Sequence, residues 1–162
     1  MLFNFFYFII IFFIIIFYNN FFYNNLQFNI MNIKSSQDLV DEANQVIETL
    51  DPLKVKLMTD NEECTLIDVR DIRELWKEGT IKNSKHIPRG MLEFWLDPQS
   101  SYYKENKFDQ NKKMILFCAL GMRSALSTKS LIDMGFENVA HVKGGFDALK
   151  QSGFEIIKKE KK

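Results

Sequence analysis

The sequence predicts an α/β fold, in which short buried strands alternate with helices around a mostly parallel sheet. Residues 65–69 and 114–117 are short apolar runs of the kind that forms buried strands. Apolar residues at helical spacing follow each run. Because parallel neighbours need a long connection, usually a helix, this alternation indicates parallel strands joined by helical crossovers.

Helices are expected where apolar side chains recur at helical spacing and a capping residue or a glycine marks an end. In chain order, these helices are residues 31–50, 51–58, 72–77, 124–134 and 146–151. Ser35 or Ser36 is the expected N-cap of the first helix, and Asp51 that of the second. Gly135 is the expected stop after residue 134.

The rest of the chain is expected to contain one more strand and one long connection. The strand covers residues 138–142 and is followed by a turn at Gly144 and Gly145. The connection, residues 89–113, is too long for a routine loop. Its aromatic side chains are expected to pack locally, and a role at the rim of a pocket is the alternative.

Charge divides the chain into two unequal parts. Residues 2–33 contain no charged side chain, so all 21 basic and 21 acidic side chains lie beyond them. This division predicts an apolar, low-complexity segment over residues 1–30, which precedes the first helix. It also predicts a globular domain over residues 51–157 and a charged tail over residues 158–162.

Two interpretations of residues 1–30 stay open. As a helix, residues 1–18 would extend about 27 Å, close to the ~30 Å apolar core of a bilayer. The basic residues that follow would then keep an anchored domain on the cytoplasmic side of the membrane. The run lacks a preceding basic region and a small-residue cleavage site, which argues against a cleaved signal peptide. Since Phe, Ile, Asn and Tyr codons can be written in A and T alone, the alternative is a mis-assigned start upstream of Met31.

Charge balance and cysteine content limit the classes of partner and cofactor. Equal numbers of basic and acidic residues, with a pI near 6.7, argue against nucleic acid as a partner. Cys64 and Cys118 are too few for a disulfide framework and indicate reduced thiols in the cytoplasm. His86 and His141 lack metal-ligand spacing, and we expect neither a metal nor another cofactor.

Cys118 is the candidate nucleophile. It follows directly after the strand at residues 114–117, at the carboxyl end, where parallel α/β sheets present ligands. Gly121 lets the next residues curl so that backbone N–H groups converge, and Arg123 starts a helix. Such a nest at a helix N-terminus binds anions and stabilises a thiolate, so Cys118 needs no histidine base.

A thiolate in an anion-binding loop can attack either a phosphate ester or the outer sulfur of a thiosulfonate. Protein tyrosine phosphatases place five residues between their cysteine and arginine, which form a ring wide enough for phosphate. Here four residues separate Cys118 from Arg123, and no general acid can be assigned for a phosphate leaving group. The shorter loop therefore favours sulfur transfer.

Three segments together resemble the signatures of rhodanese domains. Residues 66–70, with Glu74 and the Ile-Pro pair at residues 87–88, are similar to the first signature. Residues 118–124, Cys-Ala-Leu-Gly-Met-Arg-Ser, resemble the active-site loop, and residues 142–146 resemble the closing Gly-Gly signature. The resemblance covers about residues 51–153, and the joint spacing is more specific than any one fragment.

The resemblance implies a three-layer fold, with a central parallel five-stranded sheet flanked by helices. It also implies transfer of a sulfane sulfur from a thiosulfate-like donor to a thiol or cyanide acceptor, through a persulfide on Cys118. The acceptor could be a small molecule or a protein. Asp68 and Arg70 would brace the active face, and Arg123 would supply fixed positive charge or brace the loop. Substrate would bind to the backbone of Ala119, Leu120, Gly121, Met122, Arg123 and Ser124.

The sequence also departs from the family pattern and leaves two other functions open. Asn83 lies in the stretch where a glycine is usual, and asparagine can adopt the left-handed conformation. Leu149 replaces a common tryptophan. The alternatives to an enzyme of sulfur transfer are a non-catalytic persulfide carrier or interaction module, and a cysteine-dependent phosphatase or arsenate reductase.

Overall fold

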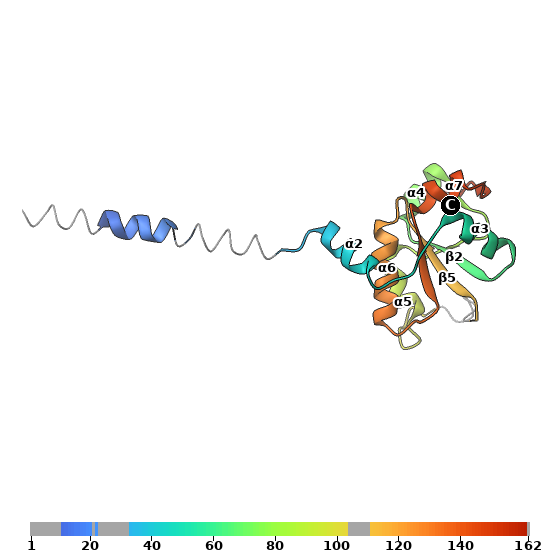
Figure 1. The fold of residues 1–162 in the computed structure, drawn as a ribbon, viewed down its shortest axis with the longest axis horizontal. Helices are drawn as coiled ribbons and strands as arrows, with labels where there is room; N and C mark the ends of the chain where they lie inside the picture. The colour runs from blue at the N-terminus through green and yellow to red at the C-terminus, as the bar shows by residue number, and fades with distance from the viewer. Residues whose placement is uncertain (1–10, 21, 23–32, 104–110, 162) are drawn as a thin grey trace, which may run out of the picture. The chain divides into compact units, whose positions relative to one another are not determined.

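The computed structural model describes residues 11–20, 22, 33–103 and 111–161. Within them, five parallel strands form a central sheet in the order β1-β6-β5-β2-β4 (Figure 1). These strands are β1 (Thr49–Leu50), β2 (Cys64–Asp68), β4 (Lys85–His86), β5 (Lys113–Phe117) and β6 (Val139–Val142). Two further short strands, β3 (Thr80–Ile81) and β7 (Ile156–Ile157), pair antiparallel in a separate sheet. The predicted parallel α/β fold is confirmed.

Helices cover both faces of the central sheet. One face packs against α3 (Pro52–Asp60) and α7 (Gly145–Gln151), and the other against α5 (Leu92–Leu96) and α6 (Met122–Asp133) (Figure 1). The remaining helices within residues 33–103 and 111–161 are α2 (Ser36–Asn44), α4 (Ile72–Glu78) and the short 3₁₀ helix η1 (Arg89–Met91). The three layers predicted from the resemblance are therefore present.

Strand β5 shows how the two cores arise from one sequence run. Ile115 and Phe117 point to the face covered by α3 and α7, whereas Met114 and Leu116 point to the face covered by α5 and α6. This is the alternation expected along a strand that is buried on both faces. Cys118 continues the second set and packs in the same core. The strand thus places the sulfur at the carboxyl edge of the sheet.

The predicted helix ends are stabilised by their side chains. The Asp51 carboxylate accepts a hydrogen bond from the N–H of Leu53 at 2.9 Å and caps α3, with Pro52 in the first turn. Ser35 Oγ accepts from the N–H of Asp38 at 3.0 Å. Gly135, with φ +95°, ends α6 in the left-handed conformation, as expected of a residue after a helix.

The helix predicted over residues 31–50 is too long. The structure ends α2 at Asn44, and Thr49–Leu50 instead forms the edge strand β1, paired in parallel with β6. The N–H of Lys143 donates to the carbonyl of Leu50 at 3.0 Å, and the Leu50 side chain is buried. Pairing with β6 and burial of Leu50 explain why this segment is extended although its spacing fits a helix.

The long connection over residues 89–113 contains helical structure. Leu92 and Leu96 of α5 are buried in the core beneath α6, and the rings of Phe94 and Tyr102 meet edge to face at 6.4 Å. For these two rings, the expectation of local packing is confirmed. Residues 104–110 lie outside the described residues.

The two departures from the family pattern fit the fold. Asn83 has a φ of 65°, the left-handed conformation for which asparagine was expected to replace glycine. Leu149 of α7 is fully buried in the core between the central sheet and helices α3 and α7.

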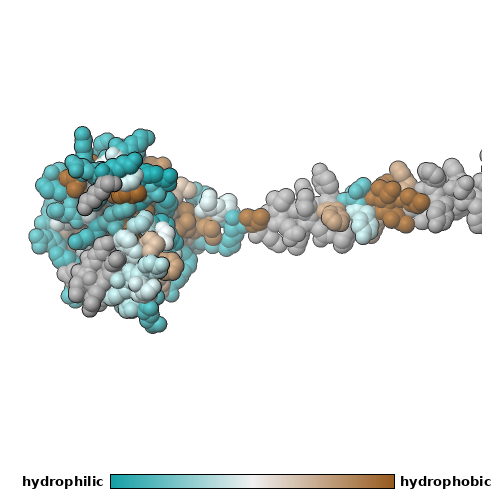
Figure 2. Space-filling view, turned by 180° about the vertical axis from the view of Figure 1, so that it is seen from behind, coloured by the Kyte–Doolittle hydropathy of each residue, from teal (hydrophilic) through white to brown (hydrophobic). Residues whose placement is uncertain are grey.

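Residues 1–38 separate from residues 39–162 as a distinct unit. Its described residues 11–20 are helical, with exposed apolar side chains such as Phe12 and Phe17. Figure 2 shows apolar residues, in brown, at the surface of the described part of this segment. Among the described residues, no helix combines the length and the apolar content that crossing a bilayer requires. Residues 1–10 and 23–30 lie outside the described residues, so both interpretations of this segment stay predictions.

Candidate active site

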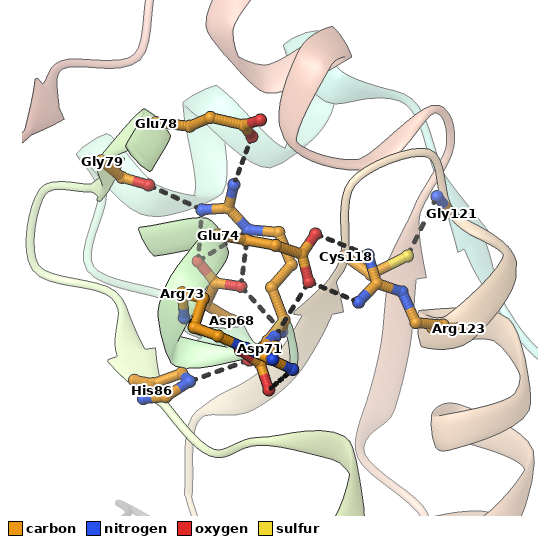
Figure 3. A network of polar contacts seen from close by, with 11 residues as sticks. Asp68, Asp71, Arg73, Glu74, Glu78, Gly79, His86, Cys118, Gly121 and Arg123 are labelled. Carbon is orange, nitrogen blue, oxygen red and sulfur yellow. Dashed lines mark hydrogen bonds and ion pairs between the residues drawn. The ribbon is translucent and has the colours of Figure 1, made fainter. Parts of the chain in front are cut away.

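Cys118 lies at the start of a tight loop between β5 and α6. Its side chain is buried, and the N–H of Gly121 donates to its Sγ at 3.2 Å (Figure 3). Gly121 has φ +103° and ψ −23°, a conformation that side chains rarely adopt, and it caps α6. The curled loop predicted from Gly121 is present, and it directs a backbone donor at the sulfur.

Helix α7 holds the loop from its outer side. The N–H of Phe146 donates to the carbonyl of Cys118 at 2.7 Å, and the N–H of Asp147 to the carbonyl of Ala119 at 3.4 Å. In a trans peptide, the C=O and the N–H point in opposite directions. The N–H groups of Ala119 and Leu120 therefore point away from α7, which leaves them available to an anion bound in the loop.

Ser124 and His141 support the loop from beneath. Ser124 Oγ donates to the carbonyl of Gly121 at 3.0 Å and lies 3.3 Å from His141 Nδ1. On the other side of the ring, His141 Nε2 lies 2.9 Å from Thr49 Oγ1. The Ser124 hydroxyl donates its proton to Gly121 and can therefore only accept from His141. We infer that the His141 ring carries its proton on Nδ1 and accepts a hydrogen bond from Thr49 on Nε2. This hydrogen-bond chain connects the edge strand β1 to the loop.

Burial keeps His141 neutral at physiological pH. Loss of solvation lowers the pKa of the imidazole from 6.5 to about 4, and the nearby carbonyl of Gly121 opposes this shift only in part. The ring thus acts as a neutral hydrogen-bonding group behind the loop. Both ring nitrogens lie within hydrogen-bond distance of a hydroxyl group, so the buried histidine has its polar atoms satisfied.

Arg123 forms a two-pronged ion pair with Glu74 of α4. Its NH1 donates to Oε2 at 2.6 Å and its NH2 to Oε1 at 2.8 Å (Figure 3). The hydrogen bonds that Arg123 donates to Glu74 raise the pKa of Arg123, and the Cys118 sulfur adds a smaller effect in the same direction. The hydrogen bonds from Arg123, in turn, lower the pKa of Glu74. Both side chains are therefore charged at neutral pH.

Asp68 and Arg70 form a buried salt bridge. Arg70 NH2 donates to Asp68 Oδ2 at 2.7 Å and to the carbonyl of Gly79 at 2.8 Å, and both side chains are fully buried. Asp68 Oδ2 also accepts from Thr80 Oγ1 at 2.7 Å. The guanidinium carbon lies 3.8 Å from the ring centre of Phe146, a cation–π contact. Because the N–H of Phe146 holds Cys118, this contact connects the salt bridge to the active loop.

The predicted residues fall into two groups. The loop from Cys118 to Ser124 is one continuous structure, in which Leu120 and Met122 have exposed side chains. Asp68 and Arg70 lie outside it, and the hydrogen bonds of their side chains connect them to each other, Thr80, Gly79 and Glu78. Sequence reasoning assigned no role to Glu74 or His141. Glu74 belongs to the segment that resembles the first signature, and this could have indicated a role for it. No motif in the surrounding sequence indicated a role for His141.

The second cysteine is separate from this site. Cys64 starts β2 opposite Lys113, at the other end of the sheet from Cys118. Burial raises the pKa of its thiol. Both cysteines are free thiols, and within the described ranges no three His, Cys, Asp or Glu side chains cluster as metal ligands.

Comparisons with known proteins agree with this geometry. Residues 51–152 match the family model described as "Rhodanese-like domain". A solved protein of unknown function from Rhodopseudomonas palustris, described as a possible tyrosine phosphatase, is 40% identical, with a TM-score of 0.72 over 76% of this chain and 95% of that one. The polysulfide-sulfur transferase homodimer of Wolinella succinogenes is 33% identical, with a TM-score of 0.59 over 74% and 85%.

Curated relatives differ in size and in name. The thiosulfate sulfurtransferase GlpE of Actinobacillus pleuropneumoniae is 26% identical over 70% of this chain and 95% of its own length. This chain spans only 55% of a chloroplastic rhodanese-like protein of Arabidopsis thaliana, at 25% identity. It spans 38% of the tRNA uridine(34) hydroxylase of Acinetobacter baylyi, at 30% identity.

We expect Arg70→Met to lower the free energy of unfolding by about 3–5 kcal/mol, because Asp68 would stay buried without its cation. Urea denaturation measures this loss. The matched control is Arg73→Met, since the Arg73 pair with Asp71 is exposed to solvent and its loss should change the free energy of unfolding much less. Equal losses of unfolding free energy in the two variants would contradict the prediction that the buried pair stabilises the fold more than the exposed pair does.

A second prediction concerns the stability of the fold in acid. The folded pKa of His141, about 4, lies below its unfolded value of 6.5, so the unfolded chain binds more protons between these values. Stability from this residue is complete above pH 6.5, and up to about 3 kcal/mol is lost as the pH falls to 4. Denaturation from pH 7 to 4 should show a steeper loss in the wild type than in His141→Asn. Parallel curves would show that the histidine does not titrate in this way.

Proposed function

Because the match to the family model spans more than half of the chain, this chain belongs to the rhodanese-like domain family, and we propose that it is a sulfurtransferase acting through a persulfide on Cys118. The observation that carries the proposal is the hydrogen bond from the Gly121 N–H to Cys118 Sγ. A backbone donor aimed at the nucleophilic sulfur stabilises negative charge on it without a histidine base.

The reaction has two displacement steps. In the first, the Cys118 thiolate attacks the outer sulfur of thiosulfate, the S–S bond breaks, and sulfite leaves while Cys118 becomes a persulfide anion. In the second, a thiolate or cyanide acceptor attacks the outer sulfur, and the Cys118 thiolate is released. No external oxidant or reductant is needed, because each step is a displacement in which one bond to the transferred sulfur forms as another breaks.

The loop suits this chemistry better than phosphoryl transfer. Only four residues separate Cys118 from Arg123, and the Arg123 guanidinium is paired through both terminal nitrogens with the carboxylate of Glu74. A phosphatase would present its arginine to three phosphate oxygens and would need a general acid for the leaving group. The description of the Rhodopseudomonas relative as a possible tyrosine phosphatase makes an aryl phosphate a useful control substrate.

Donor and acceptor are inferred from the relatives and from the composition. The names of GlpE and of the Wolinella protein suggest thiosulfate or polysulfide as the sulfane-sulfur donor. The acceptor would be a small thiol or a protein thiol, and the charge balance gives no reason to include nucleic acid. A reactive free thiol also fits a domain that works in the reducing cytoplasm.

We expect Cys118→Ser to abolish sulfur transfer from thiosulfate to cyanide, by at least about a thousandfold, while the fold persists, because the hydroxyl cannot form a persulfide. Thiocyanate formation measures the rate. Cys64→Ser is the matched control and should keep wild-type activity, since Cys64 lies at the opposite end of the sheet.

Three results would separate the possible functions. Undiminished activity of Cys118→Ser would rule out the mechanism. Loading of Cys118 with sulfur, without turnover by thiol or cyanide, would favour a persulfide carrier. Hydrolysis of an aryl phosphate that depends on Cys118 would favour a phosphatase instead.

A further inference from the structure

The ion pair between Arg123 and Glu74 lies at a site that has to receive a sulfur donor. Arg123 is the only charged residue of the active loop, residues 118–124, and both of its terminal nitrogens donate to the carboxylate of Glu74. Glu74 is fixed from a second side, because its Oε2 accepts from the N–H of Asp71 at 3.0 Å. The charge of the loop arginine is thus already matched before any donor binds.

We propose that Glu74 is a specificity-determining residue, which disfavours thiosulfate and favours a persulfide donor of low charge. This inference rests on the proposed sulfur transfer at Cys118 and names its donor class. Its physical basis is that a carboxylate held against Arg123 repels a dianion and takes up one N–H of each terminal nitrogen, which a sulfonate group would otherwise use.

The two donors place different demands on the site. Attack by the Cys118 thiolate on thiosulfate breaks the S–S bond and releases sulfite, which carries two negative charges. Attack on a persulfide, R–S–SH, gives Cys118–S–SH and releases one thiolate, R–S⁻, so the single charge only moves from Cys118 to the leaving sulfur. Backbone donors such as the Gly121 N–H can serve this single charge, whereas a dianion gains more from a cation whose charge is not already matched by a carboxylate.

The geometry also sets the expected size of the effect. The side chains of Arg123 and Glu74 are 43% and 29% exposed, so solvent screens part of the repulsion. Arg123 lowers the pKa of Glu74, which keeps the carboxylate ionised at neutral pH. Removing this charge should therefore change donor preference by about threefold to tenfold rather than by many orders of magnitude.

The test is Glu74→Gln, assayed with two donors and cyanide as the common acceptor. Glutamine keeps the shape of the side chain and an oxygen for Arg123, but removes the negative charge. We expect kcat/KM for thiosulfate to rise about threefold to tenfold, mainly through a lower KM. For the persulfide of 2-mercaptoethanol, generated in situ, kcat/KM should stay within about twofold of the wild type.

Two control variants isolate the cause. Glu74→Asp keeps the charge on a shorter side chain, and its ratio of thiosulfate to persulfide activity should stay close to that of the wild type. Glu78→Gln removes the same charge from the same helix, but Glu78 pairs with Arg70 and not with Arg123. We expect Glu78→Gln to leave the donor ratio unchanged.

The outcomes distinguish this inference from the proposed function. An unchanged donor ratio in Glu74→Gln, or an equal fall with both donors, would overturn the role of Glu74 and leave it as a structural partner of Arg123. If neither donor transfers sulfur through Cys118 in the wild type, the proposed sulfur transfer itself fails. If the wild type transfers sulfur from both donors and only the ratio shifts in Glu74→Gln, both proposals are supported.

Discussion

The close contact between the first turn of α7 and the active loop is the constraint on which the site depends. The N–H of Phe146 holds the carbonyl of Cys118, and a Cβ on Gly145 would lie 2.3 Å from that same oxygen. Only glycine permits this approach, and its φ of +61° also favours glycine. With the carbonyls of Cys118 and Ala119 turned outward, the peptide N–H groups are left for an anion at the loop.

The same helix connects the loop to the buried interior of the domain. Arg70 packs on the ring of Phe146 and is fixed by Asp68, so the Asp-Val-Arg run, the cysteine loop and the Gly-Gly-Phe run are parts of one contact network. His141 also supports the loop, through Ser124. Segments that are far apart in sequence thus hold a short loop in one conformation, which is the preorganisation that charge stabilisation requires.

The sequence predicted those features of the fold that depend on neighbouring residues in the chain. The apolar run before Cys118 and the glycine and arginine after it predicted a strand, a curled loop and a helix start, and the structure has all three. Strands of two residues, such as Thr49–Leu50, have no periodicity of their own and are defined by pairing with a distant strand. Likewise, Glu74 pairs with Arg123 because of how α4 packs in the folded chain. The spacing of residues along the sequence does not reveal that packing.

The most direct test of the central claim is the mass of the intact protein after exposure to a sulfane-sulfur donor, followed by peptide mapping. A cysteine held in an anion-binding loop should gain one sulfur atom, on Cys118 and not on Cys64, and should lose it again to cyanide. Absence of any adduct with both thiosulfate and a persulfide, or an adduct located on Cys64, would contradict the account.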